Sequence, residues 1–379
     1  MIYTGRPDVN REDQRAFRLP AHAIHPTPLS LTAIPLRVTA RVTHPVVLNE
    51  HKGSALRGAL FHALRKRSCV RLELSSCHPC ELVPVCPISA LVATVDPEWE
   101  RGTDPPRPLV VDPPLDDLTT YTAGADLEFG VTVFGSATRL LPYVVLALND
   151  LAHDGLGRRY QVGGLWTRGQ LAVRRVALAD ISGREIETLF AAPAGELPHS
   201  PLFHSPAQRV EWPAVLAAAS WLGASGEVTL RFRTPTRLVA RGELVRRFEL
   251  MPFLRRLRER LAALERRYGT PESARALAES AGSEVAGPGS EANGAASGTA
   301  FPFDADDLAA RLEVADNHTA WQEVRGYSTR QHQAVPLSGF TGSATLRGDV
   351  SSALPYLLWG SLAHVGKEAT KGNGWYALS

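Results

Sequence analysis

The stretch from Gly339 to Ser379 reads GFTGSATLRGDVSSALPYLLWGSLAHVGKEATKGNGWYALS. It predicts a Gly-flanked strand, an apolar helix, a turn rich in glycine and lysine, and a closing strand. Glycine lets a backbone approach another chain closely, and lysine neutralises phosphate. This ending therefore favours a protein that holds a nucleic-acid backbone.

Hydrophobic periodicity predicts a similar order of elements in both halves of the chain. In the first half, strands are predicted around residues 29–48, 127–133 and 171–179, and helices over 54–64 and 140–151, with a Gly/Arg loop over 155–169. In the second half, strands are predicted around 228–233, 321–327, 334–346 and 374–378, and helices over 251–267 and 353–363. Residues 29–48 are predicted to form one or two strands, and each half follows roughly the β-α-β-β-α-β order of a ferredoxin-like sheet covered by two helices.

The predicted fold class is α+β: two tandem ferredoxin-like (RRM-like) βαββαβ domains, with a Cys-rich metal-binding insertion in the first. The composition along the chain sets the expected bounds. We expect a flexible tail over 1–28, a first domain over 29–191 with the insertion at 69–86, a linker over 192–213 and a second domain over 214–379. Residues 272–300, mostly Ala, Gly, Ser and Glu, are expected to be a disordered insertion because they cannot build a core.

Composition narrows the class of protein. The 379 residues carry a net charge of 41 − 39 = +2, which is too mild by itself to indicate nucleic-acid binding. No apolar run reaches membrane-spanning length and the first residues are polar, so we expect a cytoplasmic protein without a membrane partner. The sequence has no P-loop, dinucleotide fingerprint or nucleophile elbow, and its carboxylates do not cluster as in a two-metal nuclease.

All four cysteines fall in one short window, as Cys69-x7-Cys77-x2-Cys80-x5-Cys86. A cytoplasmic chain rarely stores disulfides, and the Cys-His-Pro-Cys spacing is typical of a metal knuckle. Four thiolates would close a tetrahedral structural zinc site with no open position for a reactive water. An iron–sulfur cluster is the alternative metal group, and a simple cluster of thiols is the alternative without metal.

Four segments, in order, resemble the CRISPR-associated endoribonucleases that process repeat-containing precursor RNA, the sixth CRISPR-associated protein family within the RAMP superfamily. The segments are Lys52–Leu60 (KGSALRGAL), Thr234–Leu238 (TPTRL), Arg325–Gln331 (RGYSTRQ) with Pro336–Phe340 (PLSGF), and Leu362–Lys367 (LAHVGK) with Gly372 and Gly374. The ending departs from the pattern of the family. Glu368 replaces a glycine, Lys371 an aromatic residue and Asn373 an apolar residue.

The resemblance implies a metal-independent endoribonuclease that needs no cofactor for cleavage. In this chemistry the ribose 2′-hydroxyl attacks the neighbouring phosphate and leaves a cyclic phosphate and a free 5′-hydroxyl. The implied partners are CRISPR repeat RNA, its mature guide product (crRNA) and other CRISPR effector subunits. Two other interpretations remain open: a subunit that binds repeat RNA without cutting it, and a backbone subunit of an effector complex.

The chemistry requires a general base, a proton donor and a cation, which directs attention to histidine and lysine. The first candidates are His51 and Lys52, at the positive start of the first helix. His364, beside the C-terminal turn, and His332 are further catalytic candidates. For each histidine the alternative is a structural role near a helix cap or turn.

The candidate RNA-binding residues are basic side chains and turn glycines. Those near the first helix are Arg57, Arg65, Lys66 and Arg67, and those in the Gly/Arg loop are Arg158, Arg159 and Arg168. The remainder lie in the second half: Arg330, Gly366, Lys367, Lys371, Gly372 and Gly374. The alternative is a solvated surface for the basic residues near the first helix, and an ordinary surface hairpin for the Gly/Arg loop.

Overall fold

The computed structural model describes residues 26–95, 105–192, 208–269, 303–328 and 333–379. Most of the expected tail and linker, and the whole of the expected insertion at 272–300, lie outside these residues. The domain bounds therefore remain predictions. No helix in the described ranges is long and apolar enough to cross a membrane.

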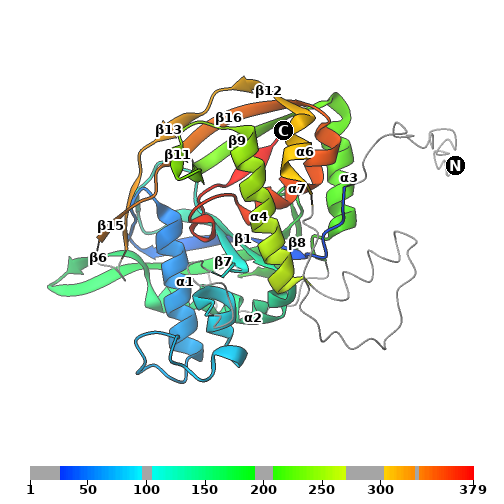
Figure 1. Cartoon of the computed structure of the whole chain (residues 1–379). Helices are drawn as coiled ribbons and strands as arrows, with labels where there is room; N and C mark the ends of the chain where they lie inside the picture. The colour runs from blue at the N-terminus through cyan, green and yellow to red at the C-terminus, as the bar shows by residue number, and fades with distance from the viewer. Residues whose placement is uncertain (1–25, 96–104, 193–207, 270–302, 329–332) are drawn as a thin grey trace, which may run out of the picture.

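The first half forms an antiparallel sheet in the order β3-β5-β1-β7. Its elements follow the chain as β1 (Ala33–His44), α1 (Lys52–Ser68), β3 (Leu109–Asp112), β5 (Asp126–Phe134), α2 (Leu141–Asp154) and β7 (Leu165–Ala179). The first strand pairs with β5 on one side and β7 on the other. This is the ferredoxin-like arrangement that the periodicity predicts, with α1 and α2 on one face of the sheet (Figure 1).

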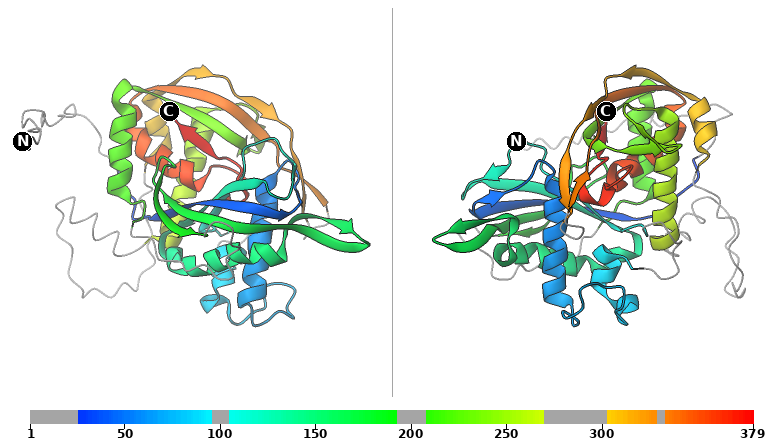
Figure 2. Two further views of the ribbon diagram at one scale, coloured as in Figure 1. Left: turned by 180° about the vertical axis from the view of Figure 1, so that it is seen from behind. Right: turned by 60° about the vertical axis from the view of Figure 1, so that its left-hand side comes forward.

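The stretch 155–169, predicted to be a loop, is instead largely a β-hairpin. It joins β6 (Leu156–Val162) to β7, and it extends well beyond the body of the molecule (Figure 2). The connection is Gly163-Gly164, and both residues have positive φ, as a two-residue hairpin turn requires. Shorter additions are β2 (Val46–Val47) paired with β4 (Thr120–Tyr121), and β8 (Glu185–Ala191) paired with β7.

The second half repeats the same topology, with the sheet order β12-β16-β9-β17. Its elements are β9 (Glu227–Thr236), α4 (Leu250–Tyr268), β12 (Leu312–Asn317), β16 (Gly339–Gly348), α7 (Val350–Ala363) and β17 (Tyr376–Leu378). Additional elements are α3 (Trp212–Leu222), α6 (Ala305–Ala310), β10 (Leu238–Ala240), β11 (Glu243–Val245), β13 (Ala320–Gln322), β14 (Arg325–Ser328) and β15 (Gln333–Pro336). The second predicted ferredoxin-like order is therefore also present.

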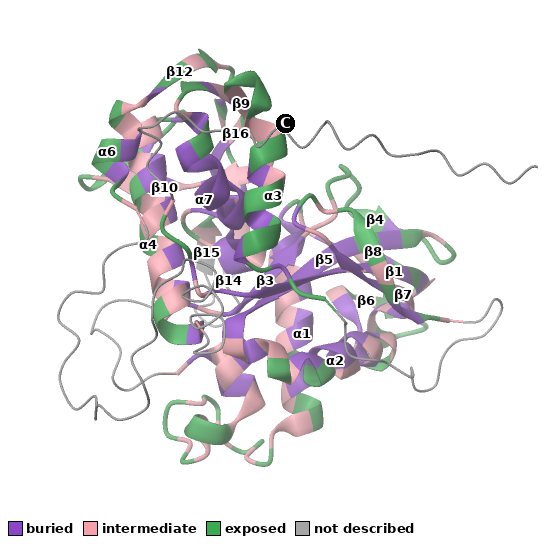
Figure 3. Cartoon of the chain, turned by 90° about the vertical axis from the view of Figure 1, so that its right-hand side faces the viewer, coloured by how far each residue is buried: buried purple, intermediate pink, exposed green. Residues whose placement is uncertain are grey.

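One hydrophobic core runs through both halves (Figure 3). In the second half it centres on Phe232, whose ring centroid lies 5.0 Å from that of Phe340 and 5.8 Å from those of Phe253 and Tyr376. The predicted apolar face of α4 is buried against it at Leu254, Leu257, Leu261 and Leu264. This packing fixes β17, and with it the end of the glycine-rich turn that precedes the strand.

Candidate functional site

The start of α1 lies against the turn formed by residues 366–374, which we call the C-terminal loop (Figure 1). A Cβ atom at Gly53 would fall 1.9 Å from the carbonyl oxygen of Lys371, so the helix reaches the loop because residue 53 is glycine. The first turn of α1 contains no acidic residue. The positive end of the helix is therefore not neutralised within that turn.

His51, the N-cap residue of α1, connects this helix to the C-terminal loop. The backbone N–H of Ser54 donates to its Nδ1 at 3.3 Å, and its Nε2 contacts the Oδ1 of Asn373. The Nδ2 of Asn373 donates to the carbonyl of Leu337 at 3.1 Å, which turns Oδ1 toward the histidine. This network favours the neutral tautomer with the proton on Nε2. Asn373 therefore positions the ring of His51. From the sequence it was noted only as a polar residue where the family pattern has an apolar one.

Burial lowers the pKa of His51, and the nearby positive charge of Lys371 lowers it further. The contact with Asn373 and the charge of Glu368 act in the opposite direction without reversing the shift. The side chain is 8% exposed. At neutral pH the imidazole is therefore uncharged, which is the form that accepts a proton.

The lowered pKa of His51 predicts a pH dependence of stability. The unfolded chain, with the ordinary histidine pKa of 6.5, takes up the proton before the folded chain does. The contribution of neutral His51 to the free energy of unfolding is therefore fully present above pH 6.5. It is lost as the pH falls from that value through the lower pKa of the folded state. Between about pH 7.5 and about pH 5, the unfolding free energy should fall more in the wild type than in His51→Gln, measured by urea unfolding. Equal decreases in the unfolding free energy of the two proteins would contradict a lowered pKa of His51.

The predicted loop glycines shape the loop itself. Gly366, Gly372 and Gly374 have φ values of +104°, +91° and +72°. An added Cβ would lie 2.6 Å from the Arg237 carbonyl oxygen at Gly366 and 1.9 Å from the Val365 carbonyl oxygen at Gly374. These glycines approach the backbone of the protein, and their expected approach to RNA stays a prediction.

Glu368 and Lys371 form an ion pair within the loop, with Nζ 2.7 Å from Oε2. Glu368 also has a left-handed backbone, φ +61° and ψ +22°, the conformation for which glycine is best suited. This explains why a glycine fits the position in the family pattern. The carboxylate partly neutralises the lysine that was expected to meet phosphate, whereas the neighbouring Lys367 is exposed.

Lys52 is buried, with a 4% exposed side chain, and its Nζ donates to Asp116 Oδ1 at 2.7 Å. Burial opposes ionisation of Asp116, but hydrogen bonds from Lys52, Tyr121 and the N–H of Leu118 outweigh it and lower the pKa of the carboxyl. The ammonium group also lies 5.6 Å from the ring centroid of Tyr121. Lys52 therefore anchors the start of α1, and its predicted catalytic role would require this pair to open.

His364 is fully buried, which argues against its predicted catalytic role. Its ring stacks on Trp375 with centroids 5.9 Å apart, and its Nε2 lies 3.1 Å from Asp112 Oδ1. Its backbone has φ +57°, which is uncommon for a residue with a side chain. A side chain held this way cannot reach a scissile phosphate on the surface. His364 instead fixes the beginning of the C-terminal loop.

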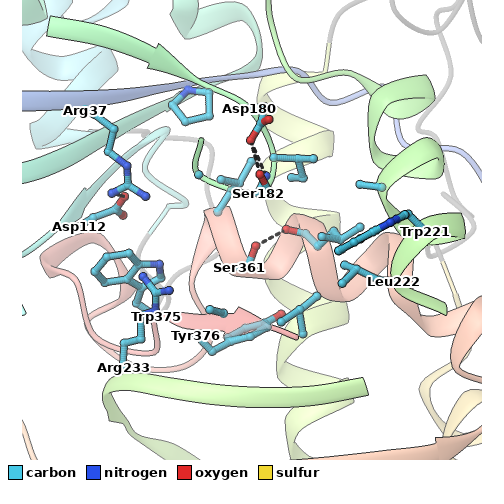
Figure 4. A pocket seen from close by; sticks show the side chains of 18 residues that line it. Arg37, Asp112, Asp180, Ser182, Trp221, Leu222, Arg233, Ser361, Trp375 and Tyr376 are labelled. Atoms are coloured by element: carbon cyan, nitrogen blue, oxygen red, sulfur yellow. Dashed lines mark hydrogen bonds and ion pairs between the residues drawn. The ribbon is translucent and has the colours of Figure 1, made fainter. Parts of the chain in front are cut away.

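Between the two halves lies a cavity of about 200 Å³ that sequence reasoning missed (Figure 4). Arg37 from β1 and Arg233 from β9 approach the indole of Trp375, with guanidinium carbons 5.7 and 5.0 Å from its ring centroid. Asp112 accepts from Arg37 at 3.2 Å. Burial lowers the pKa of Arg233, and the nearby charge of Arg37 lowers it further. Arginine and tryptophan together suit a nucleotide, which has both a charged and an aromatic part.

All four basic residues of α1 that were predicted to bind RNA contact other parts of the chain. Arg57 donates to the carbonyl of Val92 at 2.7 Å, and Arg65 donates to the carbonyl of Leu72 at 3.1 Å. The remaining two are ion-paired with α2: Lys66 with Asp154 and Arg67 with Asp150. These side chains therefore help to hold the first half together. RNA would have to compete with these contacts in order to bind them.

The predicted arginines of the β6–β7 hairpin are better placed to meet a ligand. Arg158 and Arg159 are exposed, and Arg159 and Arg168 border a polar cavity of about 570 Å³. The same cavity is lined by His62 of α1 and by Trp166, which is 66% exposed. Burial lowers the pKa of His62, and the charges of Arg168 and Arg65 lower it further. The other two predicted residues, Arg330 and His332, lie outside the described residues.

Comparison with known families gives this arrangement a context. Residues 230–376 match the model of the CRISPR-associated endoribonuclease Cas6. This part of the chain is a Cas6-family domain. It contains the whole C-terminal loop, Asn373 and Trp375, whereas His51 lies in residues 31–202, which match a model described as an N-terminal domain. The candidate site thus joins the Cas6 domain to the part that precedes it. No curated protein matches the chain.

One solved structure supports the fold of the Cas6 domain and of the half that precedes it. A chain of a partial Cas6-RT-Cas1–Cas2 complex is 13% identical with a TM-score of 0.52, over 94% of this chain and 47% of that one. The present chain thus spans about half the length of that relative. Thermus thermophilus Cas6 is 15% identical with a TM-score of 0.45, over 92% of this chain and 99% of that one. Such identities concern the fold alone.

Proposed function

We propose that the chain is a metal-independent endoribonuclease that binds CRISPR repeat precursor RNA and cleaves it to mature guide RNA. One observation carries this proposal: a neutral histidine, His51, lies at a positive helix end in contact with the C-terminal loop of a Cas6-family domain. A base, a helix dipole and lysines at one place are what attack by a ribose hydroxyl on a phosphate requires.

In the proposed reaction, His51 Nε2 removes the proton of the 2′-hydroxyl as its oxygen attacks the adjacent phosphorus. The bond from phosphorus to the 5′-oxygen breaks, that oxygen takes a proton from solvent, and a 2′,3′-cyclic phosphate remains. Nε2 can accept the hydroxyl proton only if RNA displaces its contact with Asn373. The ring proton must then lie on Nδ1. The Oγ of Ser54 lies 2.8 Å from Nδ1 and can accept a hydrogen bond from Nδ1–H.

The charge of the transition state would be met by the start of α1 and by Lys367 and Lys371 of the C-terminal loop. The cavity at Arg37, Arg233 and Trp375 adjoins the same loop, because Trp375 directly follows it, and we propose that it receives a nucleotide of the same strand. The hairpin arginines would hold a further part of the repeat. These contacts would also allow the product to stay bound for assembly with other effector subunits.

The test is incubation of the purified full chain with the CRISPR repeat RNA of its own genome in an excess of a metal chelator. The proposal expects cleavage at one position, a 2′,3′-cyclic phosphate on one product and a 5′-hydroxyl on the other. Intact RNA bound tightly under these conditions would reject the enzyme and support a binding subunit. A 3′-hydroxyl product, or cleavage that the chelator abolishes, would reject the mechanism.

A non-cleaving repeat-RNA-binding subunit of an effector complex is the second candidate. The ion pair between Glu368 and Lys371 favours it, because this carboxylate weakens the positive charge next to His51. The burial of His51 favours it as well, since a base at 8% exposure must be uncovered before it can act.

Removing the Glu368 charge should strengthen the site. In Glu368→Gln, Lys371 is free to meet phosphate, and we expect tighter RNA binding or faster cleavage by about 2–5-fold, the size of an exposed ion pair. Filter binding and single-turnover cleavage at the same salt concentration provide the measurement. The double variant Glu368→Gln/Lys371→Ala is the control and should show no gain. A gain of equal size in the double variant would show that Lys371 is not the responsible cation.

A further inference from the structure

The segment from Cys69 to Pro87 contains no buried residue, although it is a long excursion between two anchored elements. It leaves the C-terminal end of α1 and returns at the short helix η2 (Ser89–Ala93), and Figure 1 shows it below α1. Its apolar side chains do not form a core of their own, since Val70 is 76%, Leu72 54% and Val85 80% exposed. Hydrophobic burial therefore does not stabilise this segment. Small units of this kind depend on a cross-link such as a disulfide or a structural metal ion.

The four cysteines of this segment all line one small cavity of about 20 Å³. They come from different places along the segment. Cys69 is the C-cap of α1, and Cys86 directly follows the turn η1 (Val83–Val85). Both of them pack against the core, and all four thiols are free. A space of this size suits a single ion or water molecule.

The local backbone has the form of a metal knuckle. The N–H of Cys80 donates to the carbonyl of Cys77 at 3.2 Å, which closes a tight turn around His78-Pro79, and both cysteines line the same cavity. A similar turn brings Cys86 back, because its N–H donates to the carbonyl of Val83 at 3.4 Å. Arg65, which borders the cavity, places a positive charge beside the four sulfur atoms.

We propose that Cys69, Cys77, Cys80 and Cys86 bind one structural zinc ion that ties the segment to the end of α1. In the described part of the chain, no group of three or more His, Cys, Asp or Glu is already drawn together as metal ligands. The inference is therefore that the thiols close onto the ion when it binds, as metal-coupled folding allows. Four thiolates give a closed tetrahedral site, so the ion takes no part in RNA cleavage.

Metal analysis of the full chain, produced with both zinc and iron available and purified without a chelator, tests the proposal. We expect about one zinc ion per chain in the wild type and at least a tenfold lower content in Cys77→Ser and in Cys80→Ser. His78→Ala is the matched control. It removes a potential ligand from the same turn, but His78 does not line the cavity, and this variant should keep its zinc.

A second measurement on the wild type alone keeps the proposal testable if the cysteine variants fail to fold. Displacing the metal with a thiol-reactive mercurial should release about one zinc ion per chain and expose the segment to trypsin at Arg71, while the remainder of the chain stays resistant. Three results would overturn the proposal: wild type without zinc, a brown protein that carries iron and sulfide, or zinc that stays in Cys77→Ser but is lost in His78→Ala. Repeat RNA cleavage can fail without affecting any of these outcomes.

Discussion

His51→Ala should slow cleavage of the repeat RNA by about a hundredfold to ten-thousandfold, the usual contribution of a general base. Binding of uncleaved RNA should change little, because the lysines of the C-terminal loop and the hairpin arginines remain. The reason is the position of the imidazole, which is neutral at pH 7 and lies at the start of α1 against Asn373. Single-turnover cleavage with saturating protein measures the rate, and a binding assay with RNA that lacks the reactive 2′-hydroxyl measures affinity.

His44→Ala serves as the control for this experiment, because His44 is an exposed histidine at the end of β1 that does not line the cavities described above. It should retain the wild-type rate. If His51→Ala cleaved as fast as His44→Ala, the assignment of the base would be wrong even though the fold was right. If His51→Ala lost binding and cleavage together, its role would be to hold the helix and the loop in place.

Gly374→Ala should produce the second large effect, on stability. The added Cβ would fall 1.9 Å from the carbonyl oxygen of Val365, in a backbone with φ +72°, where a side chain is already strained. We expect the free energy of unfolding to fall by about 3 kcal/mol or more, because overpacking and the unfavourable φ act together. Urea unfolding followed by circular dichroism measures it.

Gly163→Ala separates the two causes. Gly163 has φ +57° at the tip of the β6–β7 hairpin, and an added Cβ would meet nothing within 4 Å. This variant has the backbone strain without the steric clash, so its free energy of unfolding should fall by only about 1 kcal/mol. Equal losses in the two variants would mean that the close approach to Val365 does not shape the loop.

The helices and most strands of both sheets could be predicted from the sequence because they depend on local periodicity. Two sheet strands, β3 (Leu109–Asp112) and β12 (Leu312–Asn317), were not among the predicted ones. Alternation over 127–133 and the apolar stripe at Leu254, Leu257, Leu261 and Leu264 are visible in the sequence and are both observed. The β6–β7 hairpin was predicted as a Gly/Arg loop, with a surface hairpin as the alternative, because its glycines and exposed arginines are typical of a loop. The strand β6 is held by hydrogen bonds to β7 rather than by burial, so its hydrophobic pattern is weak.

The candidate site was predicted less completely, because it depends on contacts between residues far apart in the sequence. His51 could be chosen as a candidate base from its position before a helix and from the family resemblance, but its contact with the C-terminal loop was not predicted. The partner Asn373 lies 322 residues away in the chain and has no local signal. The pairing of Arg37 with Trp375 and the burial of His364, which argues against a catalytic role for it, are likewise products of packing.

The central claim is that RNA is cleaved where α1 meets the C-terminal loop. The most direct measurement is photo-cross-linking of a repeat RNA that carries a 2′-deoxyribose at the mapped cleavage position and a photoreactive thio-base beside it. The account predicts cross-links within Glu50–Gly53 or within residues 366–375, identified by mass spectrometry of the peptides. Cross-links confined to the β6–β7 hairpin or to α4, with none at either of these two segments, would contradict it.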